Sequence, residues 1–175
     1  MRGISLAYAQ EQRMRTNNPT AEIQEASTDN EIDGVQDFFN SDPIREELHT
    51  YTYRNVLELA VDREDRRLYY QENEHEEMIS ALMVWCESRV LADDEAQIRL
   101  IATHPVYRRQ SLATQLTERA LAFASEWRKD RMKIDVAANE PAVDFWREQG
   151  FRDRENWETD NEREMITMER TIQED

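Results

Sequence analysis

From Ile98 to Ala113 the chain reads IRLIATHPVYRRQSLA, an apolar run followed by a polar turn that carries two arginines. The residues from Ala96 to Thr103 predict a strand, and an amphipathic helix begins just after Ser111. The amides in the first turn of a helix have no intrahelical acceptor, and the helix dipole adds partial positive charge there. A strand, an arginine-bearing turn and a helix in this order therefore indicate a seat for a phosphate group.

The segment after this turn predicts a helix and then a second strand. The apolar residues of the helix recur at steps of three and four, namely Leu112, Leu116, Ala120, Phe123 and Trp127. Apolar and charged residues then alternate from Met132 to Val136, which is typical of a strand. A strand, a helix and a strand of these lengths predict a right-handed crossover between two parallel strands.

A second helix is predicted after the second strand. Asn139 stands where an N-cap belongs, Pro141 falls in the first turn, and Gly150 follows the last turn. Phe151 onward and the run from Met165 to Met168 predict a final pair of strands, joined by a polar stretch.

The first half of the chain predicts a short strand between Ala21 and Ser27 and then a helix. Thr28 or Asp29 is the expected cap, and Asn40 to Pro43 is the expected end. The apolar face of this helix consists of Ile32, Val35, Phe38 and Phe39.

The region from Ile44 to Asp62 is ambiguous. Its apolar spacing favours a helix, whereas Tyr51 to Tyr53 suits a strand, and we favour the helix. Leu68 to Tyr70 and Met78 to Trp85 then predict an antiparallel hairpin with an acidic turn.

The composition fits one globular domain, since 39% of the 175 residues are hydrophobic and 34% are charged. We expect a polar extension over residues 1–20 and a single domain over residues 21–175. The net charge of −16 argues against a nucleic-acid partner, because such proteins neutralise phosphates with a basic face. A cationic or neutral small substrate is easier to accommodate.

Only Lys129 and Lys133 are lysines among 22 basic residues. Acidic, lysine-poor surfaces resemble those of halophilic proteins, and molar salt screens the repulsion within such a surface. We therefore expect the fold to be stabilised by high salt. An acidic protein of an ordinary cytosol is the alternative.

Cys86 is the single cysteine, so no intramolecular disulfide forms, and no cluster has the spacing of a metal site. The apolar runs are too short to span a bilayer, and residues 1–20 contain no continuous apolar stretch. These features predict a cytoplasmic protein that binds no metal and no membrane. The sequence leaves a homo-oligomer open.

Residues 94–151 resemble the conserved half of GNAT N-acetyltransferases. The resemblance rests on His104-Pro105, on Tyr107-Arg108 with the following turn and long helix, and on Asn139 with the helix ending in Phe145-Trp146-Arg147-Glu148-Gln149-Gly150-Phe151. It implies an α/β fold with a central mixed sheet of about six to seven strands, splayed at its middle and flanked by about four helices.

The resemblance further implies acetyl-CoA as a co-substrate, lying in the opening between the strand that ends near Thr103 and the strand that starts near Met132. The thioester carbonyl would meet a backbone amide of Ile101 to Thr103, and the turn would cradle the diphosphate through backbone amides. The cofactor-binding residues implied in this way are Ile101, Ala102, Thr103, Arg108, Arg109, Gln110, Ser111, Leu112, Ala113, Asn139 and Trp146.

Two departures from the family pattern affect this interpretation. Ser111 and Arg109 stand where the family's phosphate turn has glycine, which allows close approach of the backbone and positive φ. Trp146 stands where many members have a tyrosine that protonates the departing thiolate, and an indole cannot donate that proton.

The sequence names no catalytic residue. Glu87 and Glu95 flank the relevant strands as candidate bases, and Tyr107 is a candidate proton donor that more simply packs beside the turn. Two functions remain: direct transfer of an acetyl group to a primary amine of a small molecule, peptide or protein, or a catalytically degenerate relative that binds CoA as a sensor or interaction module. The resemblance implies an acceptor site lined by Ile32 to Asp62 and Trp157 to Arg163.

Overall fold

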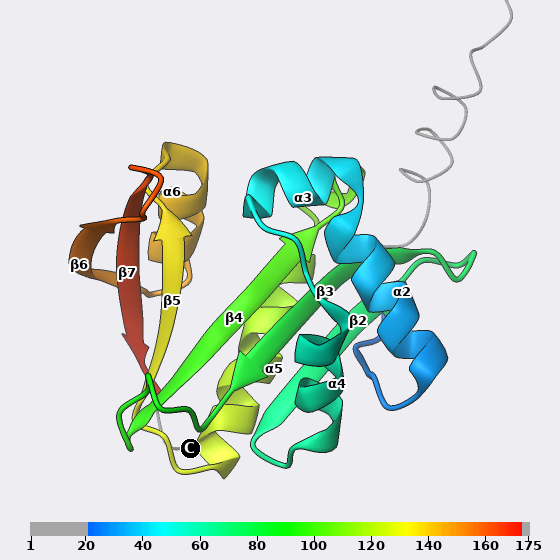
Figure 1. The fold of residues 1–175 in the computed structure, drawn as a ribbon, viewed down its shortest axis with the longest axis horizontal. Coiled ribbons are helices and arrows are strands. Elements are labelled where there is room, and N and C mark those ends of the chain that lie inside the picture. Colours follow the sequence, from blue (N-terminus) through cyan, green and yellow to red (C-terminus); the bar gives the residue numbers. More distant parts are fainter. Residues whose placement is uncertain (1–20, 173–175) are drawn as a thin grey trace, which may run out of the picture.

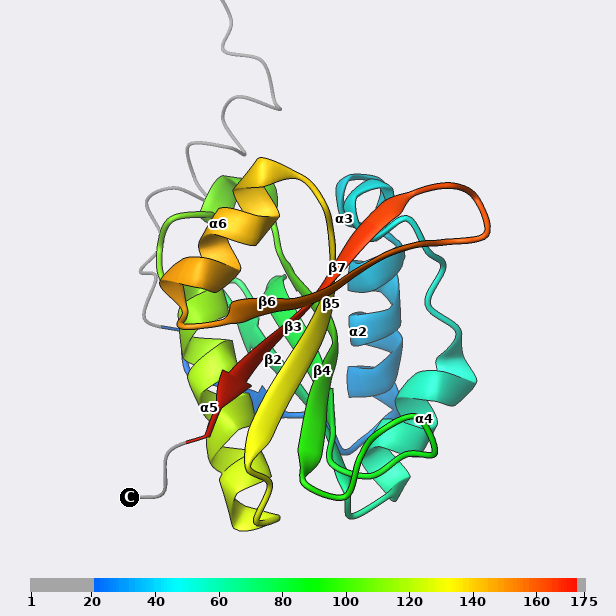
Figure 2. The same cartoon turned by 90° about the vertical axis from the view of Figure 1, so that its left-hand side faces the viewer.

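The computed structural model describes residues 21–172, which form a seven-stranded sheet between two layers of helices (Figures 1 and 2). The strand order is β1-β2-β3-β4-β5-β7-β6. Helices α2, α3 and α4 lie on one face of the sheet, and α5 and α6 lie on the other, as Figure 2 shows. The predicted α/β fold with a mixed sheet of six to seven strands is confirmed.

The strands are β1 (Gln24–Glu25), β2 (Arg66–Glu72), β3 (Met78–Trp85), β4 (Glu95–Thr103), β5 (Arg131–Ala137), β6 (Arg152–Glu158) and β7 (Glu164–Thr171). The helices are α2 (Asp29–Asn40), α3 (Asp42–Leu48), α4 (Arg54–Asp62), α5 (Leu112–Glu126) and α6 (Glu140–Glu148), with a 3-10 turn at Pro105–Tyr107. The expected hairpin is β2 and β3, and the final pair of strands is β6 and β7.

Helix α2 begins and ends as its sequence predicts. The Thr28 side chain accepts a hydrogen bond from the Glu31 amide, and Glu31 accepts one from the Thr28 amide, which makes a capping box. All four predicted apolar residues of its face are buried. The preceding strand is only two residues long, shorter than the predicted stretch.

The single helix expected between Ile44 and Asp62 is two helices. His49 has a left-handed backbone with φ of 53° and ends α3, and the extended residues Tyr51 to Tyr53 lead into α4. Side chains of Asn40 and Gln36 bond the backbone of Thr52, which holds this connection against α2. This split accounts for five α-helices in residues 21–172, against about four expected.

Strands β4 and β5 form the predicted parallel pair, but only over part of their length. Glu95 to Ile98 pair with Arg131 to Ile134, and the strands separate beyond that point. Figure 1 shows them diverging toward α3 and α6. The sheet is therefore open at its middle.

Two clusters of side chains form the main core, one on each face of the sheet. The larger lies under α5 and α6, and the other lies under α2, α3 and α4. Cys86 follows β3 and is completely buried in the larger cluster, as expected of a small apolar residue, and burial raises the pKa of its thiol to about 12. No helix within residues 21–172 has the length and hydropathy needed to span a membrane.

Candidate functional site

The open end of β4 carries the first group of predicted site residues. The pairing of β4 with β3 shifts register between Met83 and Val84, so Arg99 is an extra residue in β4, a β-bulge. Beyond it, Ile101 to Thr103 pair with β3 on one side and with no described strand on the other. The Thr103 hydroxyl oxygen is buried and bonds to none of the described residues. Polar groups on the β5-facing edge of β4 are thus available to a ligand.

The turn after β4 has the backbone conformation that glycine favours, although it contains none. Arg109 has φ of 63° and Ser111 has φ of 67°, both left-handed. A side chain in this region costs about 1 kcal/mol relative to glycine, so the two residues hold the turn in a strained shape. Strain of this kind often accompanies a binding function.

The backbone amides of this turn point to no acceptor in the part of the chain that the structure describes. The first bond of α5 runs from the Gln115 amide to the Ser111 carbonyl, and none is formed by the amides of residues 109–114. The Gln110 side-chain oxygen is also buried without a partner among these residues. Six successive donors at and before a helix N-terminus can bind an anion such as a diphosphate.

The two arginines of the turn differ in their contacts. Arg108 forms an ion pair with Glu47 of α3, and both side chains are nearly half exposed. An exposed pair of this kind contributes little stability, so a phosphate could replace Glu47 as the partner of Arg108. The Arg109 side chain is exposed and forms no ion pair within the described residues.

His104 joins β4 to the 3-10 turn and has a fixed ring orientation. Its Nδ1 accepts a hydrogen bond from the Val106 amide at 3.3 Å, which places any proton of the neutral ring on Nε2. Burial, and then the positive charge of Arg108, lower the pKa of His104 below its ordinary value. The ring is therefore a neutral hydrogen-bond donor at the edge of the turn.

Other residues near the turn are structural. Tyr107 is fully buried with Leu112 and Ile79, and its hydroxyl bonds the Asn73 side-chain amide at 3.1 Å. Tyr107 thus packs beside the turn. Ala113 is half-buried in the first turn of α5.

Asn139 and Trp146 lie at the two ends of α6 and have different environments. Asn139 is exposed, and its side-chain oxygen caps the helix by accepting from the Ala142 amide at 3.3 Å. Trp146 is 4% exposed and packs edge-on against Phe145 and Phe151 in the core. Its indole therefore offers almost no surface to a ligand in this structure.

The candidate bases considered from the sequence lie at the closed end of the sheet. Glu95 begins β4, about 25 Å of strand away from Thr103. It is 3% exposed and contacts Arg154 at 2.7 Å, Lys133 at 3.6 Å and Arg131 at 3.8 Å. Glu87 follows β3 near the same end and pairs with Lys129 at 3.6 Å. Neither carboxylate faces the open end.

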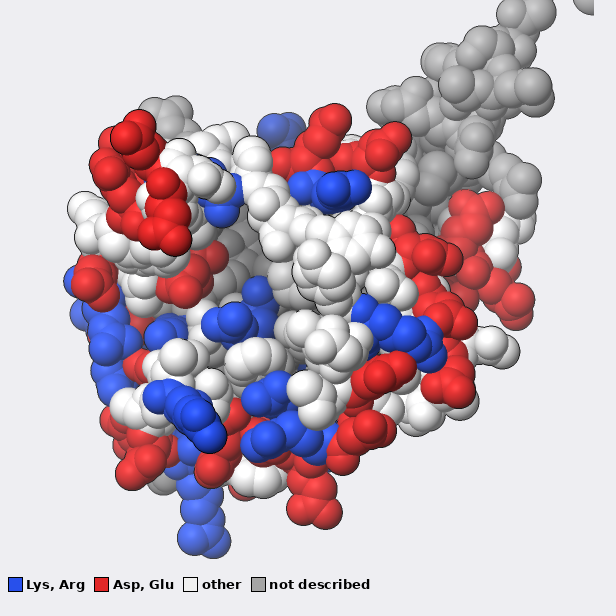
Figure 3. All heavy atoms as spheres, in the orientation of Figure 1, with Lys and Arg blue, Asp and Glu red and all other residues white. Residues whose placement is uncertain are grey.

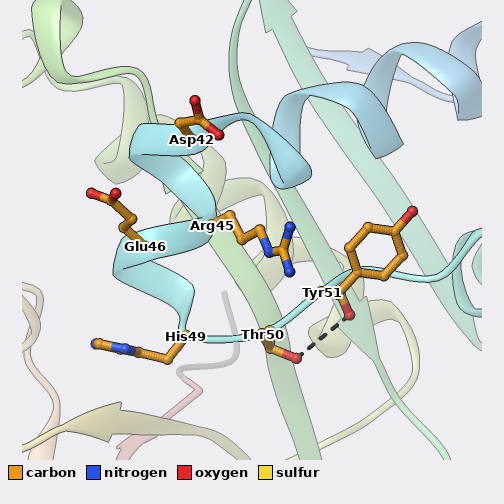
Figure 4. A pocket seen from close by; sticks show the side chains of 6 residues that line it. All are labelled: Asp42, Arg45, Glu46, His49, Thr50 and Tyr51. Atoms are coloured by element: carbon orange, nitrogen blue, oxygen red, sulfur yellow. Dashed lines mark hydrogen bonds between the residues drawn. The ribbon is translucent and has the colours of Figure 1, made fainter.

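A hollow lies on α3 and the connection to α4 (Figure 4). It is lined by Asp42, Arg45, Glu46, His49, Thr50 and Tyr51. In Figure 4 the Arg45 guanidinium lies toward the Tyr51 ring, at 5.4 Å from the ring centre. Helix α3 packs on β4, so this hollow is beside the open end, within the region expected to line an acceptor site.

Sequence reasoning missed a polar chain on the sheet that consists of Gln97, Asp135, Trp157 and Thr167. Its members come from four strands, and no local spacing connects them. The only signal was the alternation in β5, which places Asp135 on the face opposite the apolar residues.

A family model for the acetyltransferase (GNAT) family matches residues 32–151. The chain belongs to the GNAT acetyltransferase family. The match includes β4, the strained turn, α5, β5 and α6, the elements that form the open end. Members of this family use acetyl-CoA, and the donors around residues 109–114 fit its diphosphate.

Solved structures of GNAT proteins share the fold across most of their length. Ard1 from Thermoplasma volcanium has a TM-score of 0.70 at 20% identity, covering 88% of this chain and 99% of that chain. Spermidine N-acetyltransferase from Vibrio cholerae, in complex with CoA and spermine, has a TM-score of 0.68 at 15% identity, covering 89% and 97%.

The ribosomal-protein-S18-alanine N-acetyltransferase from Escherichia coli has a TM-score of 0.65 at 16% identity, covering 88% of this chain and 96% of that chain. At these identities the likeness shows the fold. No curated protein sequence matches this chain.

Proposed function

We propose that this GNAT protein transfers an acetyl group from acetyl-CoA directly to a primary amine. The observation that carries the proposal is the open end of β4 with the turn beyond it, where an unpaired strand edge meets six unbonded amides. Acetyl-CoA supplies the activated acetyl group. The strand edge at Ile101 to Thr103 receives its thioester arm.

In this proposal the diphosphate lies on the amides from Arg109 to Ala113. Arg108 leaves Glu47 to pair with it, and Asn139 faces the arm between the diphosphate and the thioester. The left-handed backbone at Arg109 and Ser111 supports this assignment, because the chain retains the shape of the phosphate turn without its glycines. The strain is already present before ligand binds, so binding need not supply it.

The acceptor in this proposal is a cationic amine. The net charge of −16 raises the local concentration of cations. Acidic side chains are visible over α3 and over the β6 and β7 side of the opening in Figure 3. Two of the structural neighbours act on amines, spermidine in one and the alanine of a ribosomal protein in the other.

A second function is favoured by one observation, the burial of Trp146. Tryptophan has no hydroxyl that could protonate a leaving thiolate, and this ring is held in the core, away from a ligand. The alternative is a degenerate member that binds CoA as a sensor or interaction module. In that case the same turn binds the diphosphate of CoA, but no acetyl group is transferred.

Calorimetric titration with acetyl-CoA and with CoA, in dilute buffer and in molar KCl, tests the shared part of both functions. We expect saturable binding at micromolar concentration. The double variant Arg108→Ala with Ser111→Asp should abolish it, because a carboxylate then faces the phosphate. Ala122→Asp adds the same charge three turns along α5 and is the control.

Transfer of labelled acetyl from acetyl-CoA to spermidine and to a peptide beginning with alanine separates the two functions. Transfer that is lost in the double variant and kept in the control supports the enzyme. Binding of CoA without transfer to any amine supports the degenerate member. A folded wild type that binds neither acetyl-CoA nor CoA contradicts both.

A further inference from the structure

Asp135 lies at the point where β4 and β5 separate. It is the first residue of β5 beyond the last parallel pair, Ile98 with Ile134. Its neighbours Ile134 and Val136 lie in the core under α5 and α6, so its half-buried side chain faces the other side of the sheet. On that side α2, α3 and α4 pack against β2, β3 and β4. The carboxylate is thus at the apex of the opening.

Neutral donors hold the Asp135 carboxylate in place. The Thr167 hydroxyl donates to Oδ1 at 2.6 Å, and the Gln97 side-chain amide donates to Oδ2 at 3.3 Å. The Trp157 indole donates in turn to the Thr167 oxygen at 3.0 Å. Because the indole is only a donor, it leaves the single hydroxyl proton of Thr167 for Asp135.

No cation pairs with Asp135 within residues 21–172, and this distinguishes it from the other carboxylate on the same face. Glu95, four positions before the bulge on β4, contacts three cations within 4 Å. Arg99 is the cation nearest along β4, and its charge interacts with that of Asp135. Its guanidinium nevertheless donates to Gln97 at 3.1 Å, lies over the Trp85 ring and forms no ion pair with Asp135 within 4 Å. Lys133, on the same face of β5, pairs with Glu95.

An oriented, half-buried carboxylate that forms no ion pair is suited to a ligand that brings a positive charge. A metal ion is disfavoured, because no group of three ligating side chains exists among the described residues. A primary ammonium needs only one carboxylate as its charged partner. Gln97, Arg99 and Thr167 are the polar groups that surround it from β4 and β7.

We propose that Asp135 binds the ammonium group of the acceptor amine and accepts its proton. The proposal rests on the proposed function, since it places the acceptor next to the strand edge that receives the thioester. One N–H bond of the ammonium breaks, its electron pair stays on nitrogen, and the proton moves to a carboxylate oxygen. The neutral amine then carries the lone pair that acetyl transfer requires. Thr167 and Gln97 act as positioning residues.

The test compares Asp135→Asn with Asp130→Asn, an exposed aspartate just before β5 with no ion pair among the described residues. Calorimetry measures binding of acetyl-CoA, and of spermidine and the alanine peptide in the presence of CoA. We expect Asp135→Asn to weaken amine binding by about ten-fold and to leave acetyl-CoA affinity within about two-fold. The kcat/KM for the amine should fall by about a hundred-fold.

Thr167→Val keeps the shape of the side chain and removes its hydroxyl. It tests the same site with Asp135 unchanged, in case Asp135→Asn does not fold. It should lower kcat by less than Asp135→Asn and leave the melting transition cooperative. Asp130→Asn should match the wild type in every measurement.

The outcomes separate this inference from the proposed function. If Asp135→Asn binds and acetylates amines as the wild type does, Asp135 has no such role, whatever the enzyme does. If the wild type does not bind acetyl-CoA, the proposed function fails, while amine binding that depends on Asp135 would still support the inference. A wild type that binds acetyl-CoA but no amine contradicts the inference.

Discussion

Strands β4 and β5 pair at one end and separate at the other, and the polar groups at the two ends have opposite surroundings. At the closed end, Glu95 is 3% exposed and contacts three cations within 4 Å. At the open end, the Thr103 and Gln110 side-chain oxygens are buried without a described partner, and Asp135 forms no ion pair with a described residue. Polar side chains at the closed end thus have their partners within the protein, whereas those at the open end lack some of theirs.

This contrast separates residues that stabilise the fold from residues that bind a ligand. Buried polar groups that are already paired contribute to the folded state, whereas unpaired ones cost stability unless a ligand completes them. Substitutions at the closed end should therefore change the free energy of unfolding and spare acetyl-CoA binding. Substitutions at the open end should change acetyl-CoA binding, and those that remove strain should raise the free energy of unfolding.

The largest expected effect is that of Glu95→Ala at the closed end. Removing this buried carboxylate leaves Lys133 without an ion pair among the described residues and takes one partner from Arg131 and Arg154, at a cost of about 3 kcal/mol. Urea denaturation measures this loss, and calorimetry should show unchanged acetyl-CoA affinity.

Glu169→Ala is the matched control for Glu95→Ala. Its carboxylate contacts Arg131 at 3.3 Å and Arg154 at 3.6 Å, but it is about one-third exposed. We expect a loss below about 1 kcal/mol for it. Equal losses in the two variants would show that burial at the closed end does not govern stability.

A smaller effect of opposite sign is expected for Ser111→Gly at the open end. Glycine relieves the left-handed backbone at φ of 67°, so the free energy of unfolding should rise by about 1 kcal/mol. Ala113→Gly, two residues further in ordinary helical backbone, should lower it by about 1 kcal/mol. Thermal or urea unfolding gives both values, and a loss of stability in Ser111→Gly would contradict the assignment of strain to this turn.

The smallest expected effect is the pH dependence that His104 contributes. Burial and then Arg108 lower its pKa in the folded protein, so the unfolded chain takes up the proton more readily. This contribution to stability is complete above the ordinary histidine pKa of about 6.5 and is lost as the pH falls through and below it. Urea unfolding at pH values from about 5 to about 8 measures how the free energy of unfolding changes with pH.

His104→Asn keeps an acceptor for the Val106 amide and should flatten this slope below about pH 6.5. His49→Asn controls for the loss of a histidine, since His49 is exposed and asparagine tolerates its left-handed backbone. If both variants keep the wild-type slope, His104 does not couple protonation to folding.

Local patterns in the sequence predicted the elements that build the opening. The apolar steps of α5, the alternation in β5 and the cap, proline and glycine of α6 were each sufficient, because backbone preferences over short distances decide them. Gly150 has φ of 87°, as the end of that helix requires. The turn between β4 and α5 was also located correctly in the chain, and its binding of phosphate stays a prediction.

Contacts between distant residues could not be predicted in this way. The pair of Arg108 with Glu47 joins residues 61 positions apart, and the bond from Thr167 to Asp135 joins residues 32 positions apart. The left-handed backbone of Ser111 was left open, since the family has glycine at this position but serine itself gives no sign of positive φ. The break between α3 and α4 depends on Asn40 and Gln36, whose side chains bond Thr52 from another helix.

The burial of Cys86 has a practical consequence. It is the only thiol in the chain, it is fully enclosed, and its pKa is raised to about 12. A thiol in this state does not ionise near neutral pH, so a cysteine thioester is not an acyl carrier between CoA and the amine. A thiol reagent can reach the sulfur only when the core beneath α5 opens. The labelling rate of the unmodified protein therefore reports how often that core unfolds, without an engineered probe.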